Sequence, residues 1–412
     1  MARTAPKKCA DSHLAASFLV ITATVVLNLA FPKLSDEPKP LRSIGQTTLL
    51  QITHLQNTLP KLIHLSYLNP ETGKYHKGWD DLYFISFWVL IWLSLRELLM
   101  KLFWNPLGSW MGLTNGKKLQ RFSEQGWTLV YCTVFWCMGI VRSSTMFSTW
   151  FTIFTHCAMP LIPQKILCAY PEPILSFNIR QYWQGYPHTS LDALSKFYYL
   201  SQIAFWFQQI VVLQVEKRRK DYYQMFAHHI VTAILVCGSY ATNFTGIGTA
   251  VHTTMDLSDI LLAFAKMLNY LKVGIVGDAS FLVFVFSWIY TRHYVLLRII
   301  FAIYKDLPQD IEFTWNPSKG QIASRSLWIA FLSLLSALEI LLMIWLFMIL
   351  KVLWKVVRGH APEDTRSDTE DTDDEAGETK SRSPKIPVSC EKQPLLSTTD
   401  RPHRGHRRQQ RK

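Results

Sequence analysis

The sequence predicts an all-α polytopic membrane protein. Of its 412 residues, 49% are hydrophobic and only 18% are charged. The apolar residues gather into runs of about 20, the length at which a helix crosses the hydrocarbon core of a bilayer. The formal net charge of +13 comes with no nucleic-acid-binding signature, so we attribute it to cytosolic loops and predict no nucleic-acid partner. The seven cysteines form no CxxC pair, which argues against a disulfide framework and a zinc ribbon.

Eight apolar segments have the length and composition of spanning helices. The first is preceded by basic residues, but it is followed by Pro32-Lys33-Leu34 and not by the small residues of a cleavage site. We therefore predict a retained anchor and not a signal peptide. The predicted spans lie at about 14–31, 81–103, 126–144, 195–215, 226–242, 247–265, 279–304 and 326–350.

Loop charges predict the orientation of these spans. Basic residues near Lys117, at 217–220, near Lys266 and near Lys355 all fall on one side when eight helices alternate. The positive-inside rule makes this side cytosolic, which predicts that both termini are cytosolic. The sequon at Asn243 falls on the lumenal side in a loop of a few residues next to the membrane, and we predict that it stays unglycosylated.

Composition divides the chain into three parts. Residues 1–80 hold the first span and an amphipathic connection, and 81–350 form a helical membrane domain. Within that domain, residues 145–175 are interrupted by prolines, which favours an interfacial or re-entrant piece over a further span. Residues 351–412 are predicted to be a disordered cytosolic tail, because they are polar, first acidic and then basic.

Ionisable side chains inside the spans mark a candidate site, because burying them in a membrane is costly. His252, Asp256 and Asp259 are spaced by four and three residues, so they share one face of a helix. At helical rise, His228 lies about 12 Å from the basic end of its helix, and the two aspartates lie about 15 and 10 Å from the basic end of theirs. The matching depths predict that a histidine of the pair His228-His229 comes within hydrogen-bond reach of an aspartate.

Such a His–Asp couple suits acyl transfer. A carboxylate can fix the imidazole tautomer and stabilise the imidazolium that forms when histidine takes a proton from an attacking amine. His228 and His229 point about 100° apart on a helix, so one can be base or nucleophile while the other binds substrate or holds the first in place.

Two alternatives to this catalytic site stay open at the level of the sequence. A membrane histidine can simply form an interhelical hydrogen bond. Histidine and aspartate also bind zinc or iron. The chain lacks HExxH, HxxxH and HxxHH patterns, and its other histidines outside the site region lie outside the spans. We therefore predict no metal.

Further polar residues in the spans are candidates for packing or for substrate contacts. Arg96-Glu97 is interpreted as an internal ion pair and Arg292-His293 as a helix-packing hydrogen bond, with substrate roles as the alternative. The basic cluster before the His pair fits the positive-inside rule and also suits the phosphates of an anionic cosubstrate such as coenzyme A. The candidate pocket or supporting residues are Trp206, Gln209, Ser258, Arg292 and His293, and the candidate acyl-CoA-binding residues are Lys217, Arg218, Arg219 and Lys220.

The stretch from Glu216 to Leu271 resembles the Lag motif of the TLC-domain ceramide synthases. It holds the HH, MDxSD and KxLNY elements in the order of that family. Further similar segments are YWQGYPH at 182–188, FWFQQIVVLQVEKRRKD at 205–221, LRELLM at 95–100 and WIYTRHYVLLRI at 288–299. The resemblance covers about residues 80–350, and the chain departs from the family in an apparent insertion at about 148–175. This insertion is either specific to its lineage or unspliced sequence.

The resemblance implies a sphingosine N-acyltransferase of the endoplasmic-reticulum membrane. Such an enzyme transfers a fatty acyl group from acyl-CoA, its co-substrate, to the amine of a sphingoid base, with no bound cofactor. The family's paired histidines map onto His228 and His229, and its carboxylates map onto Asp256 and Asp259. His252 does not belong to the family pattern, so we assign it a role in lining the pocket or in helix packing.

The resemblance also implies the architecture. The family suggests six core helices, here the second to the seventh, that enclose a lipid tunnel with coenzyme A at its cytosolic mouth. The topology and the acidic tail look like the fungal members, which allows a small accessory membrane subunit and a homodimer or a heterodimer with a paralogue. The alternative function is a non-catalytic TLC protein that binds lipid, assists translocation or transports. The sequence does not reveal the acyl-chain length.

Overall fold

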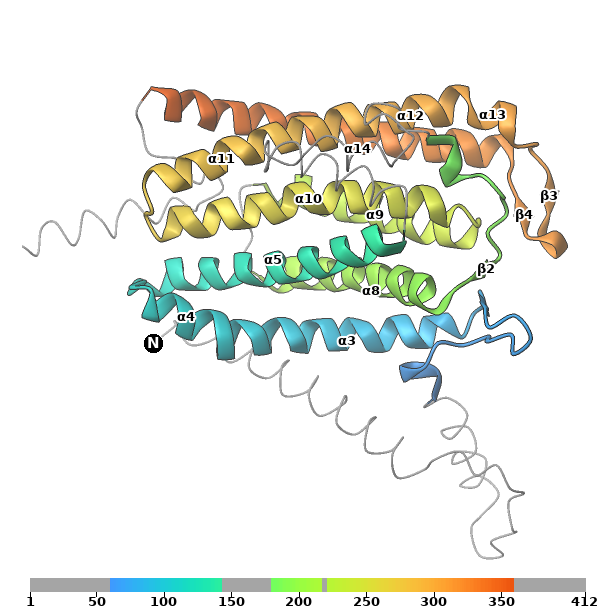
Figure 1. The fold of residues 1–412 in the computed structure, drawn as a ribbon, viewed down its shortest axis with the longest axis horizontal. Coiled ribbons are helices and arrows are strands. Elements are labelled where there is room, and N and C mark those ends of the chain that lie inside the picture. The colour runs from blue at the N-terminus through green and yellow to red at the C-terminus, as the bar shows by residue number, and fades with distance from the viewer. Residues whose placement is uncertain (1–59, 143–178, 217–220, 359–412) are drawn as a thin grey trace, which may run out of the picture. The chain divides into compact units, whose positions relative to one another are not determined.

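The helices of the membrane domain lie side by side in the computed structural model, which describes residues 60–142, 179–216 and 221–358 (Figure 1). The predicted first span, the apparent insertion, the basic cluster at 217–220 and nearly all of the predicted tail lie outside the described residues.

Each predicted span between residues 81 and 350 coincides with a helix. Two of these helices contain a π-helical turn, η1 and η3, and continue through it. The helix predicted at 126–144 begins ten residues earlier, because its first turns are amphipathic and not apolar. The helices are α3 (Asp81–Leu99), η1 (Met100–Trp104), α4 (Asn105–Trp110), α5 (Gly116–Arg142), α8 (Ala193–Val215), α9 (Tyr222–Ala241), α10 (Thr245–Tyr270), α11 (Ile275–Trp288), η3 (Ile289–Val295), α12 (Leu296–Lys305), α13 (Leu307–Asp310) and α14 (Arg325–Val357).

Three helical stretches of the described residues are long and apolar enough to cross a membrane by themselves. They are Asp81–Trp110, Ile275–Lys305 and Arg325–Val357. The chain is therefore a membrane protein. The helices α8, α9 and α10 have polar side chains inside the bundle, such as Gln208, Thr232 and Thr253, which lowers their mean hydropathy.

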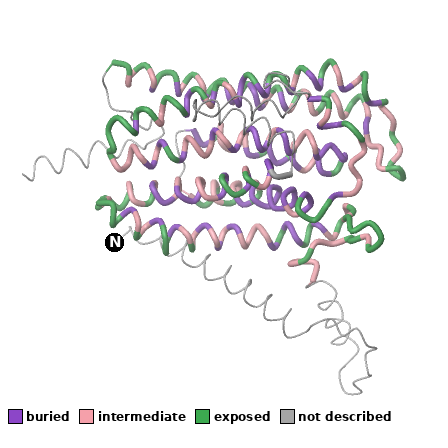
Figure 2. The backbone as a smooth tube through the Cα atoms, in the orientation of Figure 1, coloured by how far each residue is buried: buried purple, intermediate pink, exposed green. Residues whose placement is uncertain are grey.

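The helices follow one another around a ring. α3 packs on α8, α8 on α9, and α9 on α14, which contacts η3 and the helices on either side of it. From there α11 packs on α10, α10 on α5, and α5 on η1. Figure 1 shows this order as α3 at one edge, α5 and α8 beside it, then α9 and α10, and α11, α12 and α14 at the other edge. Buried residues recur along these helices in Figure 2.

Aromatic side chains fill the part of the bundle between α3, α5 and α8. Trp92 of α3 lies edge-on to Tyr131 of α5, with ring centroids 5.4 Å apart. Tyr131 also stacks on Phe205 of α8. Edge-to-face and stacked pairs are favourable arrangements of aromatic rings. This side of the bundle is therefore a solid core.

Two short antiparallel sheets lie at one end of the bundle, here called the hairpin end. β1 (Tyr75–His76) pairs with β2 (Ser190–Leu191), and β3 (Trp315–Asn316) pairs with β4 (Gln321–Ile322). The helices that follow β2 and β4 have side-chain caps. Asp192 accepts from the backbone N–H of Ser195 at 3.0 Å before α8, and Ser324 accepts from Leu327 at 3.2 Å before α14. Each cap satisfies a donor that the first turn of a helix leaves free.

A buried ion pair joins α3 to α8 at this end. Lys196 Nζ lies 2.7 Å from Asp81 Oδ1, and these side chains are 0% and 3% exposed. The ammonium also donates to the backbone carbonyls of Ser66 and His76 at 2.9 and 2.6 Å. Tyr240 of α9 donates to the other oxygen of Asp81 at 2.8 Å. This network ties the segment before α3 to three helices.

Removing the buried cation should destabilise the fold. We expect Lys196→Met to lower the free energy of unfolding by about 3–5 kcal/mol, because it leaves the Asp81 carboxylate buried without its counter-charge. The measurement is thermal unfolding in detergent. Lys61→Met is the matched control: Lys61 forms a 3.0 Å pair with Asp80 at 36% and 27% exposure, so its loss should cost about 0–1 kcal/mol. Equal effects of the two substitutions would contradict a structural role for the buried pair.

Close packing fixes the first turns of α10. A Cβ atom on Gly246 would lie 2.1 Å from the carbonyl oxygen of Tyr182, and one on Gly248 would lie 1.8 Å from the hydroxyl oxygen of Tyr199. Only glycine fits where backbones or side chains approach so closely. The start of α10 is therefore held against α8, one turn before His252.

Candidate active site

A cavity runs along the bundle between α8, α9, α10, η3, α12 and α14. It encloses about 1070 Å³ of empty space when the open solvent at its mouth is included. On α14 its lining extends from Ser324 to Leu342, a length of about 27 Å at 1.5 Å per residue. The cavity is therefore long enough for an extended lipid chain.

The wall of the cavity corrects the predicted choice of helices. The family resemblance implied that the second to the seventh helices enclose the tunnel. No lining residue comes from α3 or α5, whereas α14, the eighth predicted span, supplies several. The physical reason is the aromatic core around Trp92 and Tyr131, which fills the space that α3 and α5 share with α8.

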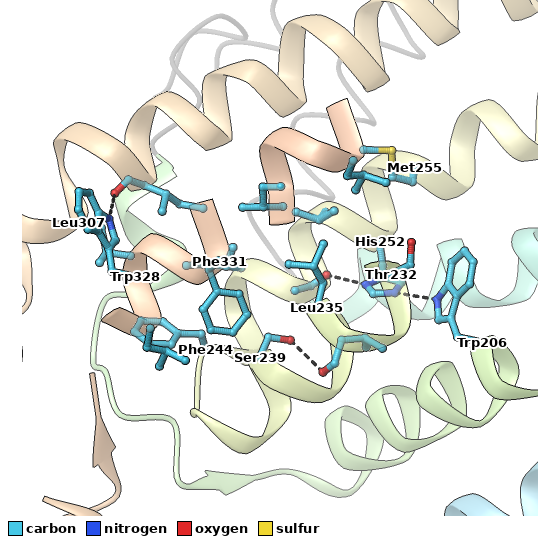
Figure 3. Close-up of a pocket in the computed structure, with 18 of the residues that line it drawn as sticks. Trp206, Thr232, Leu235, Ser239, Phe244, His252, Met255, Leu307, Trp328 and Phe331 are labelled. Atoms are coloured by element: carbon cyan, nitrogen blue, oxygen red, sulfur yellow. Dashed lines mark hydrogen bonds between the residues drawn. The ribbon is translucent and has the colours of Figure 1, made fainter. Parts of the chain in front are cut away.

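The polar groups of the cavity gather at one end. There the lining includes His228 of α9, Asp256 and Asp259 of α10, and Arg292 of η3. Toward the hairpin end the lining is almost wholly apolar, with Phe244, Leu307 and Trp328 shown in Figure 3. The cavity thus combines a polar end with an apolar channel.

Arg292 binds the second aspartate of the predicted pair. Its Nη2 atom lies 2.5 Å from Asp259 Oδ1, and its Nε atom donates to Ser258 Oγ at 2.7 Å. The guanidinium also lies over the ring of Trp288, with the central carbon 4.4 Å from the ring centroid. Arg292 is 4% exposed and Ser258 is fully buried. These contacts make Asp259 half of an ion pair.

Asp256 and His228 each have a side-chain atom outside this ion pair that makes no hydrogen bond to the described residues. Asp256 is 8% exposed, and its Oδ2 atom has no hydrogen-bond partner among the described residues. The same holds for the buried Nδ1 atom of His228. Buried polar atoms without partners are rare and cost about 1–3 kcal/mol each. Two of them in one cavity mark a place that a polar ligand group can satisfy.

The predicted hydrogen bond between an imidazole and an aspartate is not formed in the described part of the chain. The depth argument correctly placed His228, Asp256 and Asp259 at one cavity. It did not include η3, whose Arg292 takes the carboxylate of Asp259. A guanidinium is a stronger partner for a carboxylate than a neutral imidazole.

Indole rings surround the histidine pair instead. The ring centroid of Trp206 lies 5.6 Å from that of His228 and 5.7 Å from that of His229. Trp345 of α14 lies on His228 as well, at 5.2 Å. His229 is 6% exposed and is not among the residues that line the cavity. The two neighbours on α9 thus face different surroundings, as their 100° separation predicted.

The remaining candidates form contacts within and between helices. His293 Nδ1 lies 2.7 Å from Glu339 Oε1 of α14, which confirms the predicted packing hydrogen bond. Arg96 pairs with Glu97 at 2.8 Å, as predicted, and also with Glu216 at the end of α8 at 2.5 Å. Gln209 is half-buried and does not line the cavity, so its supporting role stays a prediction.

Sequence reasoning missed two residues of α14. Glu339 was detectable, because it is the one charged residue between Ser326 and Leu350 of α14, and such a residue is a functional or packing signal. Trp345 gave no signal, because aromatic residues are common in spans. Within the described ranges no three His, Cys, Asp or Glu side chains are grouped as a metal site requires. The prediction of a metal-free reaction awaits a metal analysis of the protein.

Comparisons with known proteins agree with this geometry. The family model described as the TLC domain matches residues 121–351. Sphingosine N-acyltransferase lag1 of Schizosaccharomyces pombe is 38% identical over 320 residues, which cover 77% of this chain and 74% of that protein. The chain belongs to the TLC-domain family, with the Lag1-type ceramide synthases. Ceramide synthase LAG1 of Saccharomyces cerevisiae is 32% identical over 79% of this chain and 73% of its own, and human ceramide synthase 5 is 31% identical over 48% of each.

The TLC domain contains the whole polar end of the cavity. Its matched range begins in α5 and ends in α14, so it includes the helix that carries Trp345 and excludes α3. The stretch that resembles the Lag motif corresponds to α9, α10 and the turn between them. Every residue that lines the cavity therefore lies within the range of the family match.

Proposed function

We propose that this chain is a sphingosine N-acyltransferase that transfers a fatty acyl group from acyl-CoA to the amine of a sphingoid base. The observation that carries the proposal is the cavity. At the polar end of its long apolar channel, His228 and Asp256 have buried atoms without partners among the described residues. Relatives that are 32% and 38% identical over most of the chain are named ceramide synthase and sphingosine N-acyltransferase. A lipid-chain channel with a proton acceptor at one end suits both the acyl chain and the reaction.

The proposed chemistry exchanges a thioester for an amide. The amine nitrogen attacks the thioester carbon, the bond from carbon to sulfur breaks, and the coenzyme leaves as its thiol. In the direct route His228 takes the proton from the amine and passes it to the sulfur. In the covalent route His228 first takes the acyl group as an acyl-imidazole and then releases it to the amine. Intact mass of the enzyme with acyl-CoA alone separates the routes, because only the second leaves an acyl adduct.

The two aspartates would divide their work in this reaction. Asp259 keeps Arg292 in place through the 2.5 Å ion pair. Asp256 lies in the same cavity, and its Oδ2 atom has no partner in the part of the chain that the structure describes. It can therefore accept a hydrogen bond from the ammonium or hydroxyl groups of the sphingoid base. His229, beside Trp206 and outside the cavity lining, would support its neighbour.

Ceramide formation tests the proposal directly. The protein is expressed in cells without their own ceramide synthases, and membranes are supplied with acyl-CoA and a sphingoid base. We expect new ceramide by mass spectrometry with the wild type and none with an empty vector. No ceramide from a correctly folded wild type would favour the alternative, a TLC protein that binds or moves lipid without catalysis.

A bulky side chain within the channel should shorten the acyl chain of the product. Val251 lines the cavity eight residues from Asp259, about 12 Å along α10. We expect Val251→Phe to shift the ceramide products toward shorter acyl chains, measured by mass spectrometry. Val283→Phe is the matched control, because Val283 is 54% exposed on α11. The same chain-length profile in both variants and the wild type would contradict this course of the channel.

Exposed tryptophans support a transmembrane placement of the bundle. Trp79 and Trp315 lie at the hairpin end, and Trp110 and Trp354 lie at the opposite end, at 60–85% exposure. Tryptophan is enriched at membrane interfaces. From Trp79 to Trp110 the chain rises about 46 Å at 1.5 Å per residue, close to the 40–45 Å of a bilayer with its headgroups. We place the hairpin end in the lumen of the endoplasmic reticulum and both termini in the cytosol.

The sequon at Asn243 should remain without a glycan even on the lumenal side. Asn243 is 6% exposed, its amide donates to the Gly320 carbonyl at 2.8 Å, and its oxygen accepts from Lys77 at 2.8 Å. We expect no mobility change after endoglycosidase treatment. Pro70→Asn is the positive control, because it completes a sequon with Glu71 and Thr72 in an exposed turn of the same end. Glycosylation of the wild type, or none in the Pro70→Asn variant, would argue against this arrangement.

The binding of coenzyme A by Lys217, Arg218, Arg219 and Lys220 stays a prediction, because these residues lie outside the described ranges. Partner subunits are equally untested. The mass of the purified complex in detergent, by light scattering, tests for a dimer or a small accessory subunit.

A further inference from the structure

Trp206 of α8 is the side chain that all three imidazoles of the polar end share. Its ring centroid lies 5.6 Å from His228, 5.7 Å from His229 and 6.3 Å from His252. Neither His228 nor His229 has a hydrogen bond at Nδ1 within the described residues. The contacts with indole rings therefore contribute to the orientation of both imidazoles.

A hydrogen bond to His252 holds this indole. Trp206 Nε1 lies 3.0 Å from His252 Nε2, and His252 Nδ1 lies 2.8 Å from the Gly248 carbonyl oxygen (Figure 3). An indole N–H only donates and a carbonyl only accepts, so Nε2 of His252 accepts and Nδ1 carries the proton. Both ring nitrogens of His252 are engaged. His252 is thus neutral and cannot take a proton without giving up the bond to Trp206.

The far end of this chain of contacts is closely packed. A Cβ atom on Gly248 would clash with the Tyr199 hydroxyl of α8. Helix α10 therefore approaches α8 closely at the residue whose carbonyl anchors His252. Two hydrogen bonds thus connect Gly248 of α10 through His252 to Trp206 of α8. The indole of Trp206 in turn contacts the rings of His228 and His229 on α9.

We propose that Trp206 and His252 are positioning residues that hold His228 and His229 in the orientation required for acyl transfer. The inference rests on the proposed acyltransferase function and deepens it. It brings His252, which lies outside the Lag-motif pattern, into the working site without making it a base. The bond between Trp206 and His252 is the feature that matters, because it determines where the indole lies.

Four variants test the positioning role: Trp206→Phe, His252→Leu, the double variant and His252→Gln. Trp206→Phe keeps a ring but loses the N–H, and His252→Leu removes the acceptor. We expect each single change to lower kcat about 10- to 100-fold, the effect of a small misplacement of a reacting group, with KM for acyl-CoA changed less than threefold. The double variant should be no slower than the slower single variant, because both remove the same bond.

His252→Gln separates positioning from proton transfer. The glutamine oxygen can accept from the indole but does not titrate, so we expect this variant to keep at least about a third of the wild-type kcat. Thermal unfolding and the stabilisation of each variant by acyl-CoA show that folding and substrate binding persist. Trp110→Phe, at an 82% exposed position of α4, controls for the loss of an indole.

The outcomes separate the inference from the proposed function. An inactive wild type overturns the function. With an active wild type, additive effects of the two single variants, or full activity of His252→Leu, overturn the inference. A His252→Gln variant as slow as His252→Leu also overturns it, because a titrating imidazole would then be required.

Discussion

Replacing His228 should abolish ceramide formation while the matching change at His229 should not. We expect His228→Gln to lower kcat by about 10²–10⁴-fold, the usual contribution of a general base. The imidazole of His228 lines the cavity, and its Nδ1 atom has no hydrogen-bond partner within the described ranges. His229→Gln should lower kcat by about tenfold, since His229 packs beside Trp206 and does not line the cavity.

The measurement is ceramide formation per amount of folded protein. Glutamine is used at both positions because it keeps polarity and size but cannot take a proton at neutral pH or form a stable acyl intermediate. Both variants should unfold within a few degrees of the wild type. If His229→Gln is as inactive as His228→Gln, both imidazoles take part in the chemistry and the assignment of roles is wrong.

Replacing Asp256 and Asp259 by asparagine should affect the stability of the protein differently. Asp256→Asn replaces a buried carboxyl group whose Oδ2 atom has no partner in the described residues, so the melting temperature should stay the same or rise. Its activity should fall by about 100-fold or more, as expected for loss of a carboxyl group that acts in the reaction. Stability that rises when activity is lost is typical of residues retained for function.

Asp259→Asn breaks the ion pair with Arg292 and should destabilise the protein. The expected loss is about 2 kcal/mol, the scale of a hydrogen bond to a charged group. It is smaller than for a fully buried pair, because the side chain of Asp259 is 34% exposed whereas that of Arg292 is 4% exposed. Thermal unfolding and ceramide formation are measured on both variants. A lower melting temperature for Asp256→Asn with retained activity would contradict the division of roles.

Local patterns predicted much of the fold. Each predicted span from 81 to 350 is a helix in the structure, because apolar runs of about 20 residues can hide their backbone polar groups in a membrane only by forming helices. The shared face of Asp256 and Asp259 followed from the period of the helix. The family assignment followed from the HH and MDxSD elements, and the TLC-domain match confirms it.

The partners of the site residues depended on the order of helices around the ring. Arg292 reaches Asp259 because α11 and η3, which continues it, both pack on α10. Trp345 reaches His228 because α14 packs on α9. No spacing within one helix encodes such neighbours, since they depend on how apolar faces rotate and pack across long stretches of chain.

The sequence by itself determined the class of membrane protein, the positions of the described helices, the family, and the common depth of His228, Asp256 and Asp259. Tertiary structure alone decided that Arg292 pairs with Asp259 and leaves Asp256 Oδ2 without a partner among the described residues. It also decided that indoles and not carboxylates flank His228 and His229, and that α14 forms part of the cavity wall while α3 and α5 do not. The physical reason is the range of the forces involved. Hydrophobic periodicity acts within a helix, whereas ion pairs, ring contacts and cavities arise only between helices whose packing the whole chain sets.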